Sequence, residues 1–120
     1  MYIYPFEKLE VWQLSKKLVV KIYMITKKFP ADERFGLVNQ MRRAAVSISS
    51  NLAEGSGRNT SKDQAHFYGM SYGSLMELLN QLLIASDLNW VTKEELNSVR
   101  TDMEAVSMKI NSLRKSILKG

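Results

Sequence analysis

Basic side chains are the most numerous groups in this chain that could do chemistry, and they are unevenly distributed. The 120 residues include 17 Lys or Arg against 12 Asp or Glu, a formal net charge of +5. Residues 1–60 hold ten basic and five acidic side chains, whereas residues 61–120 hold seven of each. The whole surplus therefore belongs to the first half of the chain. Such an excess of positive charge favours an anionic partner, of which nucleic acid is the first to consider.

Six of these cations are predicted to contact nucleic-acid phosphates. They are Lys16, Lys17, Lys21, Lys28, Arg42 and Arg58. Phosphate contacts from Lys and Arg give binding that weakens with salt and tolerates many sequences. No helix-turn-helix or other recognition motif accompanies them, so base-specific readout is not expected. The alternative interpretation is a solvated face that binds nothing.

Groups that could catalyse a reaction or bind a metal are scarce. His66 is the only histidine and there is no cysteine, so thiolate sites and disulfides are not expected. Asp63 and His66 have the spacing of one element of a di-iron site, but such bundles use two of these elements and further carboxylates. The segment 55–58 lacks the lysine and the preceding strand of a phosphate loop. We therefore expect no enzyme, no metal, no cofactor and no small-molecule substrate.

A second set of polar side chains runs along one helical segment, beside its apolar residues rather than opposite them. The set is Gln40, Arg43, Ser47, Asn51 and Glu54. Glu77 is the only formal charge between residues 64 and 86, and we expect it to pair with Arg43. An unpaired buried polar group costs roughly 1–3 kcal/mol, so these residues need partners. Two interpretations stay open: a structural network that sets helix register or subunit geometry, and a binding groove.

Helices must position these side chains, because apolar residues recur at steps of three and four rather than two. Pro30, the glycines near residue 55 and the segment 89–91 divide the chain into helical segments. The predicted helices are at about 6–29, 32–54, 61–88 and 93–118. With short connections in a single domain, 1–120, they predict an all-α, antiparallel up-and-down four-helix bundle.

Local signals indicate where some of these helices start and end. Gly55 is expected to end the second helix. Ser61 with Gln64, and Thr92 with Glu95, have the spacing of capping boxes and are expected to start the third and fourth.

The third helix is apolar around its whole circumference. Met70, Gly73, Ile84 and Leu88 recur at helical spacing on the side opposite its main apolar row. Either the helix is buried within its own bundle, or its second face packs on another copy of the chain. The second interpretation is favoured, because four helices in 120 residues cannot surround one of their own number.

No targeting or membrane segment is expected. The N-terminus has no basic start followed by an apolar run. A membrane span needs about 20 mostly apolar residues, and no such run occurs. These features predict a soluble, cytoplasmic protein without membrane contact.

The segment 40–55, which reads QMRRAAVSISSNLAEG, closely resembles the signature of a small bacterial family. The family consists of the four-helix-bundle proteins encoded in intervening sequences of 23S ribosomal RNA genes. Supporting matches lie at Phe6, Leu9, Val11, Trp12, Pro30, Glu33, Phe35, Gly36, Leu37 and Arg58, and in the segment 73–78. The resemblance covers nearly the whole chain.

This resemblance implies a four-helix bundle that assembles as a ring-like homopentamer without catalytic residues. The chain is also similar to the accessory variability proteins of diversity-generating retroelements, which form basic barrels that bind nucleic acid and a reverse transcriptase. We therefore expect a non-enzymatic, oligomeric RNA- or DNA-binding protein associated with RNA or the ribosome. The alternative is a structural or protein-interaction scaffold with no nucleic-acid role.

Overall fold

Four long helices account for most of the chain. In the computed structural model, which describes residues 1–119, they are α1 (Glu10–Thr26), α2 (Asn39–Ser56), α3 (Ser61–Asp87) and α4 (Lys93–Lys119). Three short turns complete the helical structure: η1 (Pro5–Lys8), η2 (Ala31–Glu33) and the π-type η3 (Arg34–Val38). The described residues contain no strand. The prediction of an all-α, four-helix fold is confirmed.

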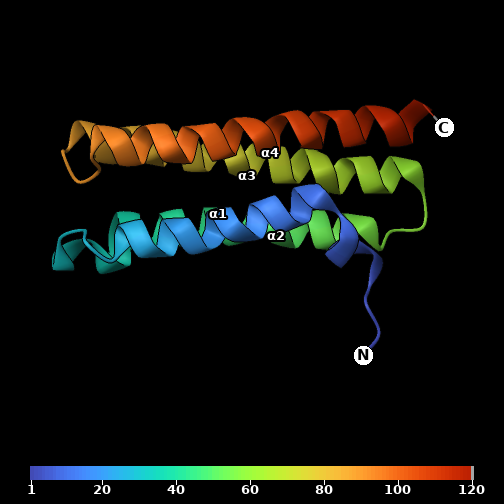
Figure 1. Ribbon diagram of the computed structural model, residues 1–120, viewed down its shortest axis with the longest axis horizontal. Coiled ribbons are helices and arrows are strands. Elements are labelled where there is room, and N and C mark those ends of the chain that lie inside the picture. Colours follow the sequence, from blue (N-terminus) through green and yellow to red (C-terminus); the bar gives the residue numbers. More distant parts are fainter. Residues whose placement is uncertain (120) are drawn as a thin grey trace.

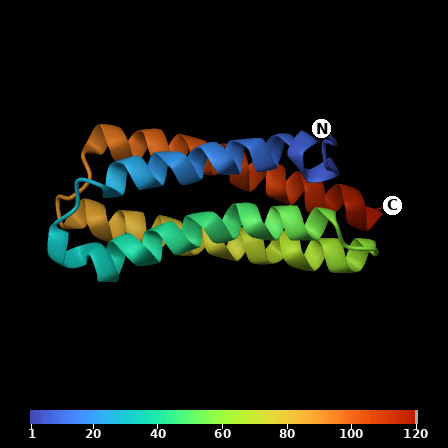
Figure 2. The same ribbon diagram turned by 90° about the horizontal axis from the view of Figure 1, so that it is seen from below.

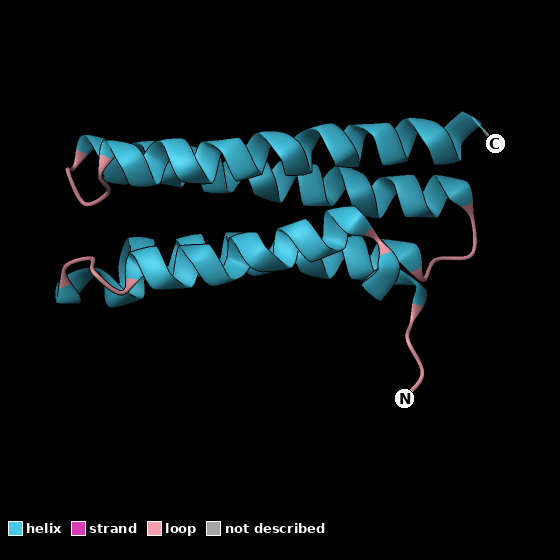
Figure 3. Cartoon of the chain, in the orientation of Figure 1, coloured by secondary structure: helices cyan, strands magenta, loops and turns pink. Residues whose placement is uncertain are grey.

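Each helix reverses the direction of the one before it. In Figure 1, α1 and α2 form one layer and α3 and α4 the other, and in Figure 2, turned by 90°, α1 lies with α4 and α2 with α3. Contacts join each helix to the next along the chain, and α1 also contacts α4. The connections lie at the two ends of the bundle, as Figure 3 shows. The result is an elongated body of 46 × 30 × 20 Å.

The core consists of the apolar residues that recur at helical spacing. The largest fully buried apolar side chains are Leu18, Ile22, Met41, Ile48, Leu52, Leu75, Leu78, Leu82, Val99, Val106 and Ile110. All four long helices contribute to this set. Because each contributes a stripe along one side, the helices pack around one shared core.

The first and second helices are shorter at their N-terminal ends than the spacing predicts. The residues before Glu10 form the 3-10 turn η1, with Pro5 at its first position. Before α2, Gly36 has non-helical backbone angles (φ −105°, ψ −115°), and the Glu33 side chain accepts a hydrogen bond from the Leu37 N–H. The α1–α2 connection is therefore a folded turn rather than the start of a regular helix.

Two predicted helix boundaries are wrong in detail. α2 continues through Gly55 to Ser56, and Gly57 is its C-cap. At the start of α3 the N-cap is Thr60, whose hydroxyl accepts the Asp63 N–H at 3.1 Å, rather than Ser61. The hydroxyl one residue earlier has the extended backbone that an N-cap requires. The capping box at Thr92 and Glu95 is confirmed, with reciprocal hydrogen bonds of 3.0 and 3.1 Å.

No helix within residues 1–119 combines the length and the apolar character needed to cross a membrane.

Candidate nucleic-acid interface

Two of the predicted phosphate-binding lysines, Lys16 and Lys17, lie at successive positions of α1. Both are exposed, and neither forms an ion pair with any carboxylate of the described chain. The Lys16 ammonium lies 5.1 Å from the centre of the Trp12 ring, a cation–π contact that leaves its charge unneutralised. Lys16 and Lys17 are therefore available to an anion in solution.

Three other predicted cations are paired with acidic side chains of the same chain. Lys21 on α1 contacts Asp102 on α4, and also donates to the Ser98 hydroxyl at 2.8 Å. Lys28 contacts Glu95 at the start of α4. The first pair joins α1 to α4 and the second joins the α1–α2 connection to α4, and both leave less positive charge for a ligand.

Arg58, in the α2–α3 connection, is the third paired cation. It lies 3.6 Å from a Glu54 oxygen and 3.8 Å from an Asp63 oxygen, and its guanidinium carbon is 4.2 Å from the Phe67 ring centre. Ion pairs between exposed groups are weak, so a phosphate can compete for Arg58.

The Glu95 carboxylate shows the electrostatic effect of this pairing most clearly. The hydrogen bond from Lys28 lowers the pKa of Glu95 below its ordinary value, and the bond from the Thr92 N–H lowers it further. Glu95 is therefore ionised near neutral pH and carries the negative charge that pairs with Lys28.

Arg42, the sixth predicted cation, reaches across from α2 to the C-terminal end of α1. Its Nε donates to the Thr26 hydroxyl at 3.0 Å, and its Nη2 donates to the Tyr23 carbonyl at 3.3 Å. Its guanidinium carbon also lies 4.6 Å from the Tyr23 ring centre. Within residues 1–119 no carboxylate pairs with it.

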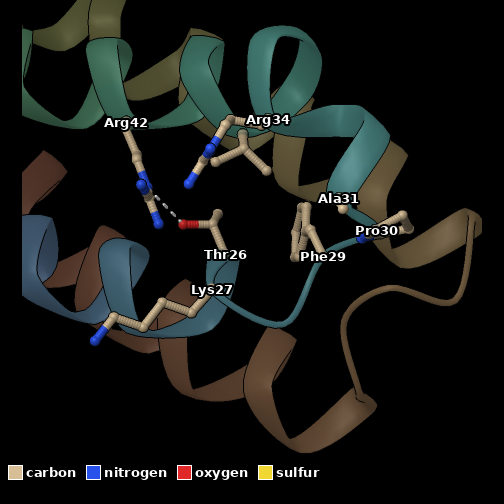
Figure 4. A pocket seen from close by; sticks show the side chains of 8 residues that line it. Thr26, Lys27, Phe29, Pro30, Ala31, Arg34 and Arg42 are labelled. Atoms are coloured by element: carbon tan, nitrogen blue, oxygen red, sulfur yellow. Dashed lines mark hydrogen bonds between the residues drawn. The ribbon is translucent and has the colours of Figure 1, made fainter.

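Two basic residues that the sequence did not single out, Lys27 and Arg34, line the same pocket as Arg42. Figure 4 shows Arg34 and Arg42 reaching down from the α2 side, with Lys27 on the α1 side. The sequence contained a signal for this arrangement, because Lys27 precedes Phe29 and Pro30 and Arg34 follows them. A turn at the proline brings the residues before and after it close together.

The predicted polar set on α2 divides into separate contacts. Ser47 hydrogen-bonds Ser74 of α3 at 2.8 Å, and the Asn51 amide donates to the Ser47 carbonyl at 2.9 Å and to its hydroxyl at 3.1 Å. Gln40 and Arg43 are exposed. Ser47, Asn51 and Ser74 thus join α2 to α3.

The predicted pairing of Arg43 with Glu77 is not formed in the described structure. Glu77 instead accepts a hydrogen bond from the Gln81 amide at 3.3 Å, one turn along α3. Both Arg43 and Glu77 are exposed, so neither requires the other as a buried partner.

The outer side of α3 exposes apolar side chains. Met70 is 38%, Ile84 44% and Leu88 48% exposed. Among them, the Gln81 Oε1 atom is buried without a hydrogen-bond partner in the described chain. Gly73 lies on the same side, with no atom within 4 Å of the place where a Cβ would be.

His66 is exposed near the start of α3, and its ring lies 5.8 Å from that of Phe67. Across residues 1–119 no three His, Asp or Glu side chains come together in a way that could hold a metal ion.

Comparisons with known proteins agree with this architecture. The family model described as 23S rRNA-intervening sequence protein matches residues 7–112. A solved structure from the S23 ribosomal protein family of Bacteroides thetaiotaomicron, a protein of unknown function, is similar with a TM-score of 0.79. The two share 19% sequence identity, and the match covers 88% of this chain and 98% of the other. At that identity the likeness shows the fold alone. No curated protein matches the chain.

Proposed function

Because the chain belongs to the family of 23S rRNA-intervening sequence proteins, we propose that it is a non-enzymatic, oligomeric nucleic-acid-binding protein associated with RNA or the ribosome. The observation that carries the proposal is a set of five cations without carboxylate partners on α1, the α1–α2 connection and the first turn of α2. The set is Lys16, Lys17, Lys27, Arg34 and Arg42. We refer to these residues as the unpaired basic set.

The unpaired basic set recognises phosphate rather than base. Lys16 and Lys17 are exposed on a helix whose outer side faces solvent, so they approach a nucleic-acid backbone without rearranging the bundle. Contacts of this kind release counterions and give affinity that falls steeply with salt. They carry no sequence information, so the protein tolerates many sequences.

The oligomer is the second part of the proposal. The apolar outer side of α3, with Met70, Ile84 and Leu88 exposed, is the surface that we assign to contact between copies of the chain. A ring-like homopentamer is the assembly that the family resemblance implies. Symmetric copies would repeat the unpaired basic set around the assembly and so strengthen attraction to a polyanion.

Salt-dependent RNA binding tests the proposal. Fluorescence anisotropy with a labelled single-stranded RNA measures affinity over a series of salt concentrations. We expect the double variant Lys16→Glu, Lys17→Glu to bind at least tenfold more weakly. The slope of log affinity against log salt concentration should become less steep by about 0.7 for each phosphate of the single strand that the variant no longer neutralises.

The matched control for that experiment is the double variant Lys62→Glu, Lys115→Glu, which changes the net charge equally on the half of the chain that has no surplus. It is expected to bind nearly as well as the parent. An equal loss of RNA affinity in both double variants would mean that binding depends on net charge alone and not on Lys16 and Lys17. An absence of binding at low salt would reject the proposed function.

A structural or protein-interaction scaffold is the alternative. It is favoured by one observation: Lys21, Lys28 and Arg58 are paired with carboxylates of their own chain. In that case the cations hold the helices together, and RNA does not bind at any salt concentration.

A further inference from the structure

A pocket of about 530 Å³ lies between the C-terminal end of α1 and the turns that lead into α2. Its volume falls within the roughly 300–1,000 Å³ of small-molecule sites. Three cationic side chains line it, together with an apolar wall. They are Lys27, Arg34 and Arg42, with Phe29, Pro30 and Val38.

Positive charge in this pocket has no internal counterion. Within residues 1–119 none of the side chains that line it is acidic. The nearest acidic residues in sequence are Asp32 and Glu33, and Glu33 is engaged by the Leu37 N–H at 3.2 Å. A bound anion would therefore supply the negative charge that the lining of this pocket lacks.

Arg42 is held in place before any ligand arrives. The buried Thr26 hydroxyl donates to the Ile22 carbonyl at 2.7 Å, which leaves an oxygen lone pair to accept the Arg42 Nε–H. The Tyr23 carbonyl accepts from Nη2, and the Tyr23 ring lies against the guanidinium. These contacts use two of the five N–H donors, so the remaining donors are fixed in position and free to bind an oxyanion.

We propose that this pocket binds a phosphate ester. Arg42 and Arg34 donate hydrogen bonds to the phosphate oxygens, Lys27 adds positive charge, and the wall formed by Phe29 and Pro30 contacts the organic part of the ligand. Free nucleotides and nucleic-acid ends present the same phosphate chemistry. Where the ligand is an RNA phosphate, the inference rests on the proposed function and gives it a specific site.

Calorimetric titration at low salt tests the pocket with three probes: inorganic phosphate, a nucleoside 5′-monophosphate and the corresponding nucleoside. We expect the monophosphate to bind most tightly and the nucleoside at least tenfold more weakly, since it lacks the charged group. The variant Arg34→Gln should weaken monophosphate binding about fivefold to tenfold, because it removes a charge-assisted contact. Lys27→Gln should weaken it less, because Lys27 contributes positive charge without a contact to the phosphate.

Lys62→Gln is the matched control, because Lys62 is an exposed lysine of α3 that neither lines the pocket nor belongs to the unpaired basic set. It should leave monophosphate affinity unchanged. Arg34 makes no hydrogen bond to another side chain in the described structure, so Arg34→Gln is expected to fold normally, which circular dichroism checks. Equal affinity of the parent and Arg34→Gln for the monophosphate, or no binding to the parent, would overturn the inference.

Binding measurements with RNA distinguish a terminal RNA phosphate from a free nucleotide as the ligand. They also distinguish failure of the pocket from failure of the proposed function. Tighter binding of a 5′-phosphorylated RNA than of its 5′-hydroxyl form, abolished in Arg34→Gln, supports a terminal phosphate as the ligand. RNA binding that needs Lys16 and Lys17 but not Arg34 overturns the pocket and leaves the proposed function standing. Monophosphate binding that needs Arg34, without any RNA binding, supports the pocket and rejects the proposed function.

Discussion

At the scale of the residue, Gly55 shows how a single missing side chain sets the distance between two helices. A Cβ at this position would lie 2.7 Å from the Tyr68 ring and 2.9 Å from the Phe67 Cβ. The backbone there is ordinary α-helix, so its conformation does not require glycine. Glycine is needed because α2 and α3 approach closely at this point, and both Gly55 and Tyr68 are buried.

We predict that Gly55→Ala destabilises the fold by about 1–3 kcal/mol, the usual cost of overpacking a core. The matched control is Gly73→Ala, where nothing lies within 4 Å. There the better helix propensity of alanine should raise stability by up to about 1 kcal/mol. Urea unfolding of dilute protein, followed by circular dichroism, measures both. Equal stability of Gly55→Ala and the parent would show that the two helices can move apart at no cost.

At the scale of the element, the start of α4 is stabilised by its own capping box and by a lysine of the α1–α2 connection. Thr92 and Glu95 cap the helix reciprocally, and Lys28 contacts the second Glu95 oxygen. Because the pKa of Glu95 is lowered in the folded state, its charge stabilises the fold above the carboxyl's ordinary pKa of 4.5. That stabilisation is lost as the pH falls through the lower folded-state pKa.

The variant Glu95→Gln tests this contribution, since glutamine can still accept the Thr92 N–H but carries no charge. Near pH 7 it should be about 0.5–1 kcal/mol less stable than the parent. At about pH 3, below the ordinary carboxyl pKa, the difference should be smaller, and it should disappear once the pH lies below the lowered folded-state pKa of Glu95. Glu94→Gln is the control, because Glu94 is exposed and has no ion pair in the described chain. A Glu95→Gln deficit that is the same at both pH values would assign the effect to packing or capping instead.

At the scale of the whole molecule, the outer side of α3 exposes apolar side chains that a self-sufficient bundle would bury. Ile84 and Leu88 are 44% and 48% exposed, and the Gln81 Oε1 atom is buried without a partner. A second copy would bury the exposed apolar groups.

Light scattering coupled to size exclusion at micromolar concentration measures the assembly. We expect the parent to form a homo-oligomer and Ile84→Glu to dissociate, because a buried unpaired carboxylate strongly disfavours the contact. Met108→Glu, at a 69% exposed position of α4, should assemble like the parent. A monomeric parent, or an Ile84→Glu variant that assembles normally, would contradict the assignment of this surface.

The sequence by itself determined the four helices, their apolar seams and the position of the charge surplus. These properties depend on spacing along the chain: a period near 3.6 residues specifies which side chains share a face of a helix. The capping box at Thr92 and Glu95 was predictable for the same reason, since its two partners are three residues apart.

Only the tertiary structure decided which charges are neutralised. Lys21 and Asp102 are 81 residues apart, and Lys28 and Glu95 are 67 residues apart. Whether such residues meet depends on how each helix is rotated and shifted against its neighbours, which periodicity does not specify. The same holds for the pocket that brings Lys27 and Arg34 beside Arg42, because a folded turn rather than a regular helix connects α1 to α2.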